Sequence, residues 1–336
     1  MNTQLLFPIE EASQVGNARR AATEMASKLG FDAEQAGKLA LAVTEASTNI
    51  LKHAQQGRVL LRPIDSGTAI AIELLALDRG PGIANLAASL RDGHSTAGSP
   101  GTGLGALARL SSSFELFTQP NRGTALRLEI SSDGSDAAAQ SPMFQLGAIC
   151  VAKSGEPVSG DDWHSTHNGR YINVLVADGL GHGVDAAKAS RGATDSLRDA
   201  PDATPHALIE RSHAALAVTR GAAVAVARLD PGAQLGSFAG VGNIVARIEG
   251  QACRHLVSHN GTVGHNVRRI QEFAFPWTTG SLLILHSDGL TTHWSLSDYP
   301  GLSQKHPALI AGVLYRDLER GRDDVTVVVV RNGAQQ

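Results

Sequence analysis

Four acidic motifs lie at the ends of apolar segments in the second half of the sequence, and their side chains have the chemistry to bind divalent cations. They are Asp161-Asp162, Asp178-Gly179, Asp288-Gly289 and Asp323-Asp324. A single Asp-Gly pair is more often the start of a turn. Four such groups in one site would repel each other unless hard cations lay between them. Two cations can also bind a phosphoryl group and activate a water molecule. The set therefore predicts a metal site for phosphoryl chemistry.

The first half of the sequence contains a different polar pattern, which is typical of nucleotide binding. Glu45, Asn49 and His53 are spaced four residues apart and therefore share one stripe of a predicted helix. A turn at 78–82 begins with Asp78, and its Gly80 and Gly82 let a ligand approach the backbone. The segment 101–105 opens another helix, whose free amide groups suit phosphate oxygens. A polar helix face or a glycine turn is weak evidence alone, but the three motifs in this order indicate a nucleotide site.

Composition predicts two domains and excludes several classes of partner. The 336 residues can form two cores, and the small, polar stretch near 131–142 predicts a linker. We expect domains at 1–131 and 143–333, with the linker at 132–142. A net charge of -3 without a basic run argues against nucleic-acid binding. Cys150 and Cys253 lack the spacing of a zinc site or a disulfide framework. No signal-like or membrane-spanning segment is evident, so we expect a cytoplasmic protein without a membrane partner.

The periodicity of apolar residues predicts α+β architecture in both domains. In the first domain we expect helices at 11–29 and 32–53, strands at 58–64 and 69–77, and a hairpin that turns at 121–123. In the second domain we expect strands at 144–152, 171–177, 222–229, 282–286 and 325–331, and helices at 184–199, 205–217 and 306–320. Many strands with few helices predict a layered sandwich of sheets flanked by helices.

With these motifs in place, residues 5–130 resemble the GHKL ATPase superfamily, and within it the anti-sigma-factor and stressosome switch serine kinases of the RsbW/RsbT type. The resemblance implies an α/β sandwich with helices on one face of a mixed sheet. It also implies that Asn49 binds Mg²⁺, Glu45 acts as general base or orients the nucleophile, and Asp78 binds the adenine amino group of ATP. The same resemblance assigns the shaping of the nucleotide pocket to a set of glycines and one threonine. These are Gly80, Gly82, Gly101, Thr102, Gly103 and Gly105.

Residues 143–331 resemble the PPM phosphatase superfamily, in particular its SpoIIE/RsbX-like branch. The stretch Asp-Gly-Leu-Gly-His-Gly at 178–183 and the terminal Asp-Asp-Val-Thr-Val at 323–327 carry this resemblance. It implies an α-β-β-α sandwich with two Mn²⁺ or Mg²⁺ ions, bridged by Asp178, and catalysis that depends on Asp178 and Asp288. The implied ligands are Asp161, Asp178, the Gly179 carbonyl, Asp288 and Asp323. Asp162 and Asp324 remain alternatives to Asp161 and Asp323, and His182 is either a substrate contact or a surface residue.

Together the two resemblances predict a bifunctional partner-switching regulator. One domain would phosphorylate a protein with Mg-ATP, and the other would hydrolyse phosphoserine or phosphothreonine. The implied substrate is a STAS-domain anti-sigma antagonist or a stressosome-type protein, with a sigma factor as a further partner. The alternatives are an N-terminal domain that only binds ATP or sequesters a partner, and a scaffold in which both domains are inactive.

Overall fold

The structure is a computed structural model that describes residues 4–65, 70–89, 103–134, 143–250 and 253–333. The chain divides into two compact units, with the division between residues 140 and 141. Gly101 and Thr102, which the sequence predicts in the nucleotide site, lie outside the described residues. Among the described residues, no helix combines the length and apolar character needed to cross a membrane.

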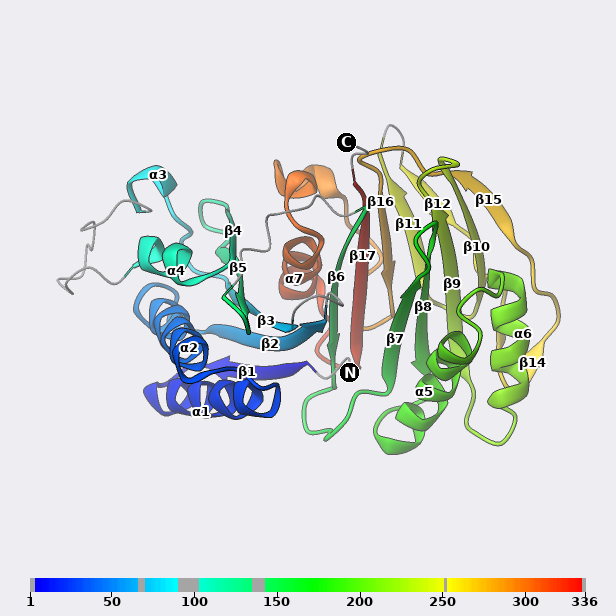
Figure 1. Cartoon of the computed structure of the whole chain (residues 1–336). Coiled ribbons are helices and arrows are strands. Elements are labelled where there is room, and N and C mark those ends of the chain that lie inside the picture. Colours follow the sequence, from blue (N-terminus) through cyan, green and yellow to red (C-terminus); the bar gives the residue numbers. More distant parts are fainter. Residues whose placement is uncertain (1–3, 66–69, 90–102, 135–142, 251–252, 334–336) are drawn as a thin grey trace. The chain divides into compact units, whose positions relative to one another are not determined.

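The N-terminal unit is a five-stranded sheet with two long helices on one face (Figure 1). Its elements follow in chain order: β1 Leu5–Ile9, α1 Ala12–Lys28, α2 Ala33–His53, β2 Gly57–Asp65, β3 Ile70–Asp78, α3 Leu86–Ser89, α4 Leu104–Leu110, β4 Ser113–Thr118 and β5 Thr124–Ser131. The strand order is β1-β2-β3-β5-β4. The predicted helices on one face of a sheet are therefore confirmed.

The prediction of a mixed sheet in this unit is wrong, because all four strand pairs are antiparallel. The connection between β1 and β2 explains the difference. A single crossover helix brings the chain back for a parallel strand. Here two helices, α1 and α2, follow one another and pack together. They return the chain to the end of the sheet where β1 finished, so β2 runs back along β1.

Helix α2 carries the predicted polar stripe because its opposite face is fixed to the sheet. Asp32 caps the helix by accepting a hydrogen bond from the Gln35 backbone N–H at 2.7 Å. Leu39, Val43 and Ile50 are buried in the core of this unit. Their helical spacing leaves the neighbouring positions for polar side chains.

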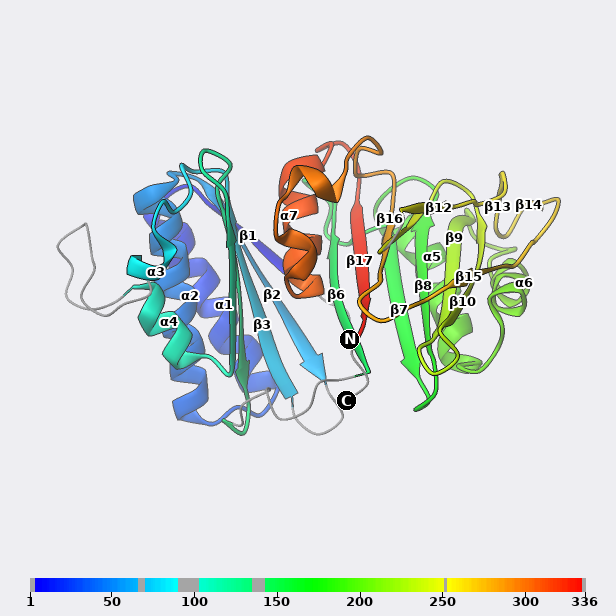
Figure 2. The same ribbon diagram turned by 90° about the horizontal axis from the view of Figure 1, so that it is seen from above.

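The C-terminal unit is an α-β-β-α sandwich, as the sequence predicts. One sheet has the order β15-β10-β9-β8-β7 and the other β12-β11-β16-β17-β6, and both contain five strands. Figure 2 shows these sheets of the C-terminal unit stacked together, with α5 and α6 beyond one sheet and α7 beyond the other. The strands are β6 Phe144–Val151, β7 Asp161–His167, β8 Ile172–Gly179, β9 Ala222–Asp230, β10 Leu235–Val241, β11 Val245–Glu249, β12 Arg254–Leu256, β15 Phe273–Pro276, β16 Leu282–His286 and β17 Val325–Asn332.

Three helices and a small hairpin complete this unit. The helices are α5 Val184–Asp199, α6 Pro205–Ala215 and α7 Pro307–Leu318, and the hairpin pairs β13 Gly261–Thr262 with β14 Asn266–Val267. One core lies between the two sheets and includes Val176, Phe238 and Val328. A second core lies between α5, α6 and their sheet. Packing on both faces of a sheet holds its strand ends in fixed positions.

Candidate active sites

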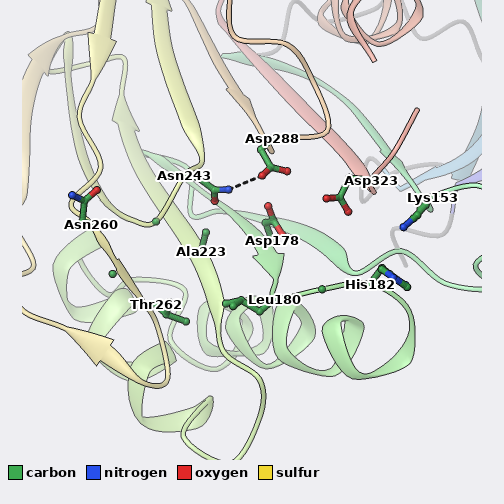
Figure 3. Close-up of a pocket in the computed structure, with 13 residues that line it drawn as sticks. Lys153, Asp178, Leu180, His182, Ala223, Asn243, Asn260, Thr262, Asp288 and Asp323 are labelled. Carbon is green, nitrogen blue, oxygen red and sulfur yellow. Dashed lines mark hydrogen bonds between the residues drawn. The ribbon is translucent and has the colours of Figure 1, made fainter. Parts of the chain in front are cut away.

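Three predicted metal ligands of the C-terminal unit line one cavity of about 540 Å³. Asp178 belongs to β8, Asp288 follows β16, and Asp323 precedes β17. Because β16 and β17 are paired neighbours and β8 belongs to the facing sheet, the strand ends bring the three carboxylates together. Figure 3 shows their oxygen atoms directed toward a common space.

The electrostatics of this cavity disfavour charged carboxylates in the absence of cations. Burial, followed by the charges of Asp288 and Asp323, raises the pKa of Asp178 from its ordinary 3.8 to about 7. Burial and the neighbouring Asp323 also raise the pKa of Asp288. Positive charge between these groups would remove the repulsion that causes part of the shifts.

The side chains of the adjacent residues Asp161 and Asp162 have different surroundings in the structure. Asp161 lies directly opposite Asp178 in the β7–β8 pair and is only 5% exposed. Burial, followed by the charge of Asp178, raises the pKa of Asp161 well above its ordinary value. The adjacent Asp162 instead accepts a hydrogen bond from the Thr194 hydroxyl of α5 at 2.7 Å. Asp161 does not line the cavity but belongs to the same electrostatic cluster.

Asp323 and Asp324 also have different surroundings. Asp323 is exposed and lines the cavity. Asp324 is 3% exposed, and its Oδ1 accepts a hydrogen bond from the Lys153 backbone N–H at 2.8 Å. The Oδ2 atoms of Asp161 and Asp324 are buried without a hydrogen-bond partner. Such atoms carry an energetic cost that a cation or an ordered water would remove.

The donor set fits a hydrated hard cation. Within the described ranges, no three His, Cys, Asp or Glu side chains lie close enough together to enclose one ion by themselves. Mg²⁺ commonly keeps several waters and binds through only one or two carboxylates and a substrate phosphate. All the predicted donors are oxygen atoms, which hard cations prefer. The residues present therefore suit Mg²⁺ or Mn²⁺ with water in the remaining positions.

The cavity also contains polar residues to which the sequence pattern assigns no role. Asn243, in the turn after β10, donates a hydrogen bond from Nδ2 to Asp288 Oδ2 at 2.8 Å. Lys153 follows β6, and Asn260 and Thr262 come from the segment that includes β13. Figure 3 shows Lys153 and His182 near Asp323, with Asn260 and Thr262 on the other side of Asp178. Lys153 follows the strand predicted at 144–152, which is the one sequence signal for it, whereas no predicted strand directly precedes Asn243.

In the N-terminal unit, Asp78 is fixed at the point where β3 ends. Its Oδ1 accepts hydrogen bonds from the backbone N–H groups of Gly80 at 2.8 Å and Thr124 at 3.2 Å. Gly82 has a left-handed φ of 74°, and a Cβ there would lie 2.3 Å from the Gln119 carbonyl oxygen. Glycine is thus required in this turn, because a side chain would collide with the β4–β5 connection.

Glu45 and Asn49 lie one turn apart on α2 and are both partly buried. Across the described part of the chain, neither side chain makes a hydrogen bond or an ion pair. Their polar atoms are therefore available to a ligand. Gly103 precedes α4 as its N-cap, and Gly105 is buried in that helix. The structure thus describes every predicted nucleotide-site residue except Gly101 and Thr102.

Comparisons with known proteins assign each unit to a family. Residues 7–130 match the family described as "Histidine kinase-like ATPase domain", and residues 168–332 match the family "Stage II sporulation protein E (SpoIIE)". The chain joins a histidine kinase-like ATPase domain to a SpoIIE domain. The resemblances to ATPases and phosphatases drawn from the motifs are confirmed.

Two proteins of Bacillus subtilis (strain 168) are similar to the two domains. The ATPase domain is similar to the serine/threonine-protein kinase RsbT, with 28% identity over 127 residues that make up 38% of this chain and 96% of RsbT. The SpoIIE domain is similar to the phosphoserine phosphatase RsbX, with 23% identity over 140 residues, or 41% of this chain and 70% of RsbX. The chain therefore combines domains of families that contain a kinase and a phosphatase.

Solved structures give the same picture of the fold. A structure described as "The bacterial stressosome: a modular system that has been adapted to control secondary messenger signaling" covers 56% of this chain and 100% of its own, with 27% identity and a TM-score of 0.54. Crystalline RsbX in complex with magnesium covers 58% of this chain and 98% of its own, with 18% identity and a TM-score of 0.50. At that identity the second similarity concerns the fold alone.

Proposed function

We propose that the SpoIIE domain hydrolyses phosphoserine or phosphothreonine in a protein substrate with the help of two Mn²⁺ or Mg²⁺ ions. The observation that carries the proposal is the convergence of Asp178, Asp288 and Asp323 in one cavity. The raised pKa of Asp178 supports it, because carboxylates arranged in this way are typical of functional sites.

The two ions would be held by Asp178, Asp288, Asp323, Asp161 and the Gly179 carbonyl. Bound ions would neutralise the phosphoryl oxygens and lower the pKa of the attacking water. Asn243 would hold the Asp288 carboxylate in position through its hydrogen bond. Such support of a ligand fixes its orientation toward the ion.

The other cavity residues would bind the phosphoester. Lys153 is the one cationic side chain among the described residues that line the cavity, apart from a protonated His182. Its ammonium group, on the side near Asp323, suits an oxygen of the dianionic phosphoryl group. The neutral Asn260 and Thr262, across the cavity, suit the peptide that carries the phosphate. This distribution of charge favours a phosphomonoester within a peptide.

We further propose that the ATPase domain binds Mg-ATP and transfers phosphate to a protein hydroxyl. Asn49 would bind Mg²⁺, Glu45 would accept the hydroxyl proton, and Asp78 would bind the adenine amino group. Gly80, Gly82, Gly101, Thr102, Gly103 and Gly105 would shape the pocket. Among the described residues, Glu45 and Asn49 have no hydrogen-bond or ion-pair partner. This supports the proposal, since proton acceptance and metal binding both need accessible polar atoms.

The proposed protein substrate is a STAS-domain anti-sigma antagonist or a stressosome-type protein, with a sigma factor as a further partner. The similarity to RsbT and to a structure described as a stressosome supports this choice. A STAS protein that gains phosphate with ATP and loses it with Mn²⁺ would support the complete partner-switching function. A STAS protein that does neither would contradict it.

Hydrolysis of an aryl phosphate in the presence of Mn²⁺ is the direct test of the phosphatase. We expect activity in the unmodified chain and its loss in Asp178→Ala and Asp288→Ala. Asp162→Asn is the matched control, because Asp162 is adjacent to a predicted ligand but bonds to Thr194 of α5. An unmodified chain that neither hydrolyses the ester nor binds Mn²⁺ by calorimetry would refute the assignment.

A further inference from the structure

A short segment at the β13–β14 hairpin forms one wall of the cavity. Its residues Asn260, Gly261 and Thr262 line the cavity, and we call them the hairpin wall. Figure 3 places Asn260 and Thr262 on the opposite side of Asp178 from Lys153. All three residues of the hairpin wall are neutral. They therefore bring polar groups to the cavity without adding to the negative charge of the metal site.

The side chains of Asn260 and Thr262 are available to a ligand. Asn260 is exposed, and Thr262 is partly buried. Throughout the described part of the chain, neither side chain makes a hydrogen bond. A carboxamide and a hydroxyl each offer a donor and an acceptor. They therefore match the main chain of a peptide, in which an ordinary residue also carries one donor and one acceptor.

Two histidines hold the hairpin in place from outside the cavity. Gly264, in the hairpin turn, donates its backbone N–H to Nδ1 of His213 on α6 at 3.0 Å. His265 Nε2 lies 3.0 Å from the Thr219 carbonyl oxygen. Since a carbonyl oxygen only accepts, His265 is the donor in this bond. Neither histidine is among the described residues that line the cavity, so each would act on a ligand only through the position of the hairpin.

Close packing anchors the turn that these bonds orient. Val263 is buried in the core between α5, α6 and their sheet, and its backbone exchanges two hydrogen bonds with Ala222 of β9, at 2.9 and 3.0 Å. Gly221 has a left-handed φ of 78°, and a Cβ there would lie 2.7 Å from Cδ2 of His265. Gly264 and His265 follow Val263 directly. Their bonds therefore fix the orientation of the hairpin about this anchor, and with it the hairpin wall.

We propose that Asn260 binds the main chain of the phosphorylated protein beside the phosphoserine, and that His213 and His265 are positioning residues for it. The inference rests on the proposed phosphatase function and names the part of the substrate that the same site recognises. Oδ1 of Asn260 would accept a hydrogen bond from a main-chain N–H, and Nδ2 would donate one to a carbonyl oxygen. Main-chain groups flank a phosphoserine whatever the sequence around it. The site therefore selects a phosphopeptide over a small phosphoester.

The test compares a peptide with a phosphoester that has no main chain. The probes are a short capped peptide with one phosphoserine among alanines, and 4-nitrophenyl phosphate, each with the full chain and Mn²⁺. The preference is the ratio of kcat/KM for the peptide to kcat/KM for the aryl ester. Asn260→Leu should lower this preference by about 10-fold, the scale of one lost hydrogen bond. The loss should lie in KM for the peptide rather than in kcat.

Methylation of the peptide nitrogens on both sides of the phosphoserine tests the main chain directly. It removes the N–H donors of the substrate and should lower the preference of the unmodified chain. It should have little further effect on Asn260→Leu, because the acceptor is already absent. A lower preference in Asn260→Leu without any effect of methylation on the unmodified chain would overturn main-chain recognition.

Substitution of His213 separates positioning from folding. His213→Leu removes the acceptor of the Gly264 N–H and should lower the preference several-fold, whereas His213→Gln keeps an acceptor and should restore most of it. His265→Leu should also lower the preference. His206→Leu is the matched control, because His206 lies on the same helix but pairs with Glu210 at 3.5 Å, and it should leave the preference unchanged.

The failure of this inference differs from the failure of the proposed phosphatase. A variant that still hydrolyses 4-nitrophenyl phosphate is folded and holds metal. Equal losses in His213→Leu and His213→Gln, or none in either, would overturn the positioning role. An unmodified chain that hydrolyses the aryl ester without preferring the peptide would overturn the recognition by Asn260. An unmodified chain inactive toward both probes would instead contradict the phosphatase.

Discussion

The two domains form their candidate sites in different ways. In the SpoIIE domain, Asp178, Asp288 and Asp323 adjoin the ends of three strands in two packed sheets. In the ATPase domain, Glu45 and Asn49 lie on a helix face, while Asp78 lies in a glycine-containing turn fixed by backbone hydrogen bonds. Burial and the neighbouring carboxylates raise the pKa of Asp178 to about 7 and also raise that of Asp288. The difference indicates that the carboxylates of the metal site are positioned by two packed sheets, whereas the polar side chains of the nucleotide site are presented on a helix and a turn.

The largest expected effect tests whether the two sites act independently. Asp288→Asn removes one negative charge from the cavity and should reduce Mn²⁺-dependent phosphatase activity by about 1000-fold. ATP affinity, measured by calorimetry on the same protein, should be unchanged. If the same substitution also abolished ATP binding, the two sites would not be independent.

A smaller loss of activity is expected from a substitution at the nucleotide site of the ATPase domain. Glu45→Gln keeps the shape of the side chain but cannot accept a proton, so phosphate transfer should fall by about 100-fold. Nucleotide binding should persist. Glu34→Gln is the control, because Glu34 lies on the same helix but pairs with Lys38 on its surface. Tight ATP binding without any transfer by the unmodified chain would instead support the binding-module alternative.

The adjacent Asp323 and Asp324 allow the metal site to be defined more sharply. Asp323→Asn should weaken Mn²⁺ binding by about 10- to 100-fold, because this side chain lines the cavity. Asp324→Asn retains an acceptor for the Lys153 backbone N–H and should affect affinity less. Isothermal titration with Mn²⁺ compares the two directly. A greater loss of Mn²⁺ affinity for Asp324→Asn would indicate that Asp324, rather than Asp323, is the metal ligand.

The smallest expected effect concerns stability and pH. The pKa of Asp178 is raised in the folded protein from 3.8 to about 7, so folding favours its protonated form. The stabilisation is complete below the ordinary value and is lost as the pH rises through about 7. The melting temperature of the metal-free SpoIIE domain should therefore fall by a few degrees between pH 5 and pH 8. Mn²⁺ should reverse this fall at pH 8, and calorimetry of the chain with and without chelator would detect both changes.

Much of the fold could be predicted from local patterns in the sequence. Helix α5 and strand β16 have the predicted bounds, since each is a continuous periodic or apolar segment. Asp178 and Asp288 are predicted as metal ligands because each comes at or just after such a strand. Strand β7 was missed because its sequence, Asp161–His167, contains one large apolar side chain, Trp163, among polar ones. Its pairing with β8 depends on tertiary contacts rather than on propensity.

Contacts across long stretches of sequence explain the remaining omissions. The hydrogen bonds of His182 with Glu156 and of Asn243 with Asp288 join segments 26 and 45 residues apart. Neither pair has a fixed spacing that a motif could encode. The antiparallel sheet of the ATPase domain was likewise decided by the packing of α1 against α2. Sequence pattern thus predicts the site residues that adjoin strongly apolar strands or lie on periodic helices, while the neighbours of those residues required the fold.

The division of the phosphatase site between two sheets has a mechanical consequence. Asp178 moves with the sheet that contains β8, whereas Asp288 and Asp323 move with the sheet that contains β16 and β17. Any sliding of one sheet over the other changes the separation of the carboxylates on which two bound ions would depend. The apolar layer between the sheets, including Val176, Phe238 and Val328, therefore sets the distance between the carboxylates of the two sheets. Substitutions in this layer would therefore alter the proposed hydrolysis although its side chains do not line the cavity.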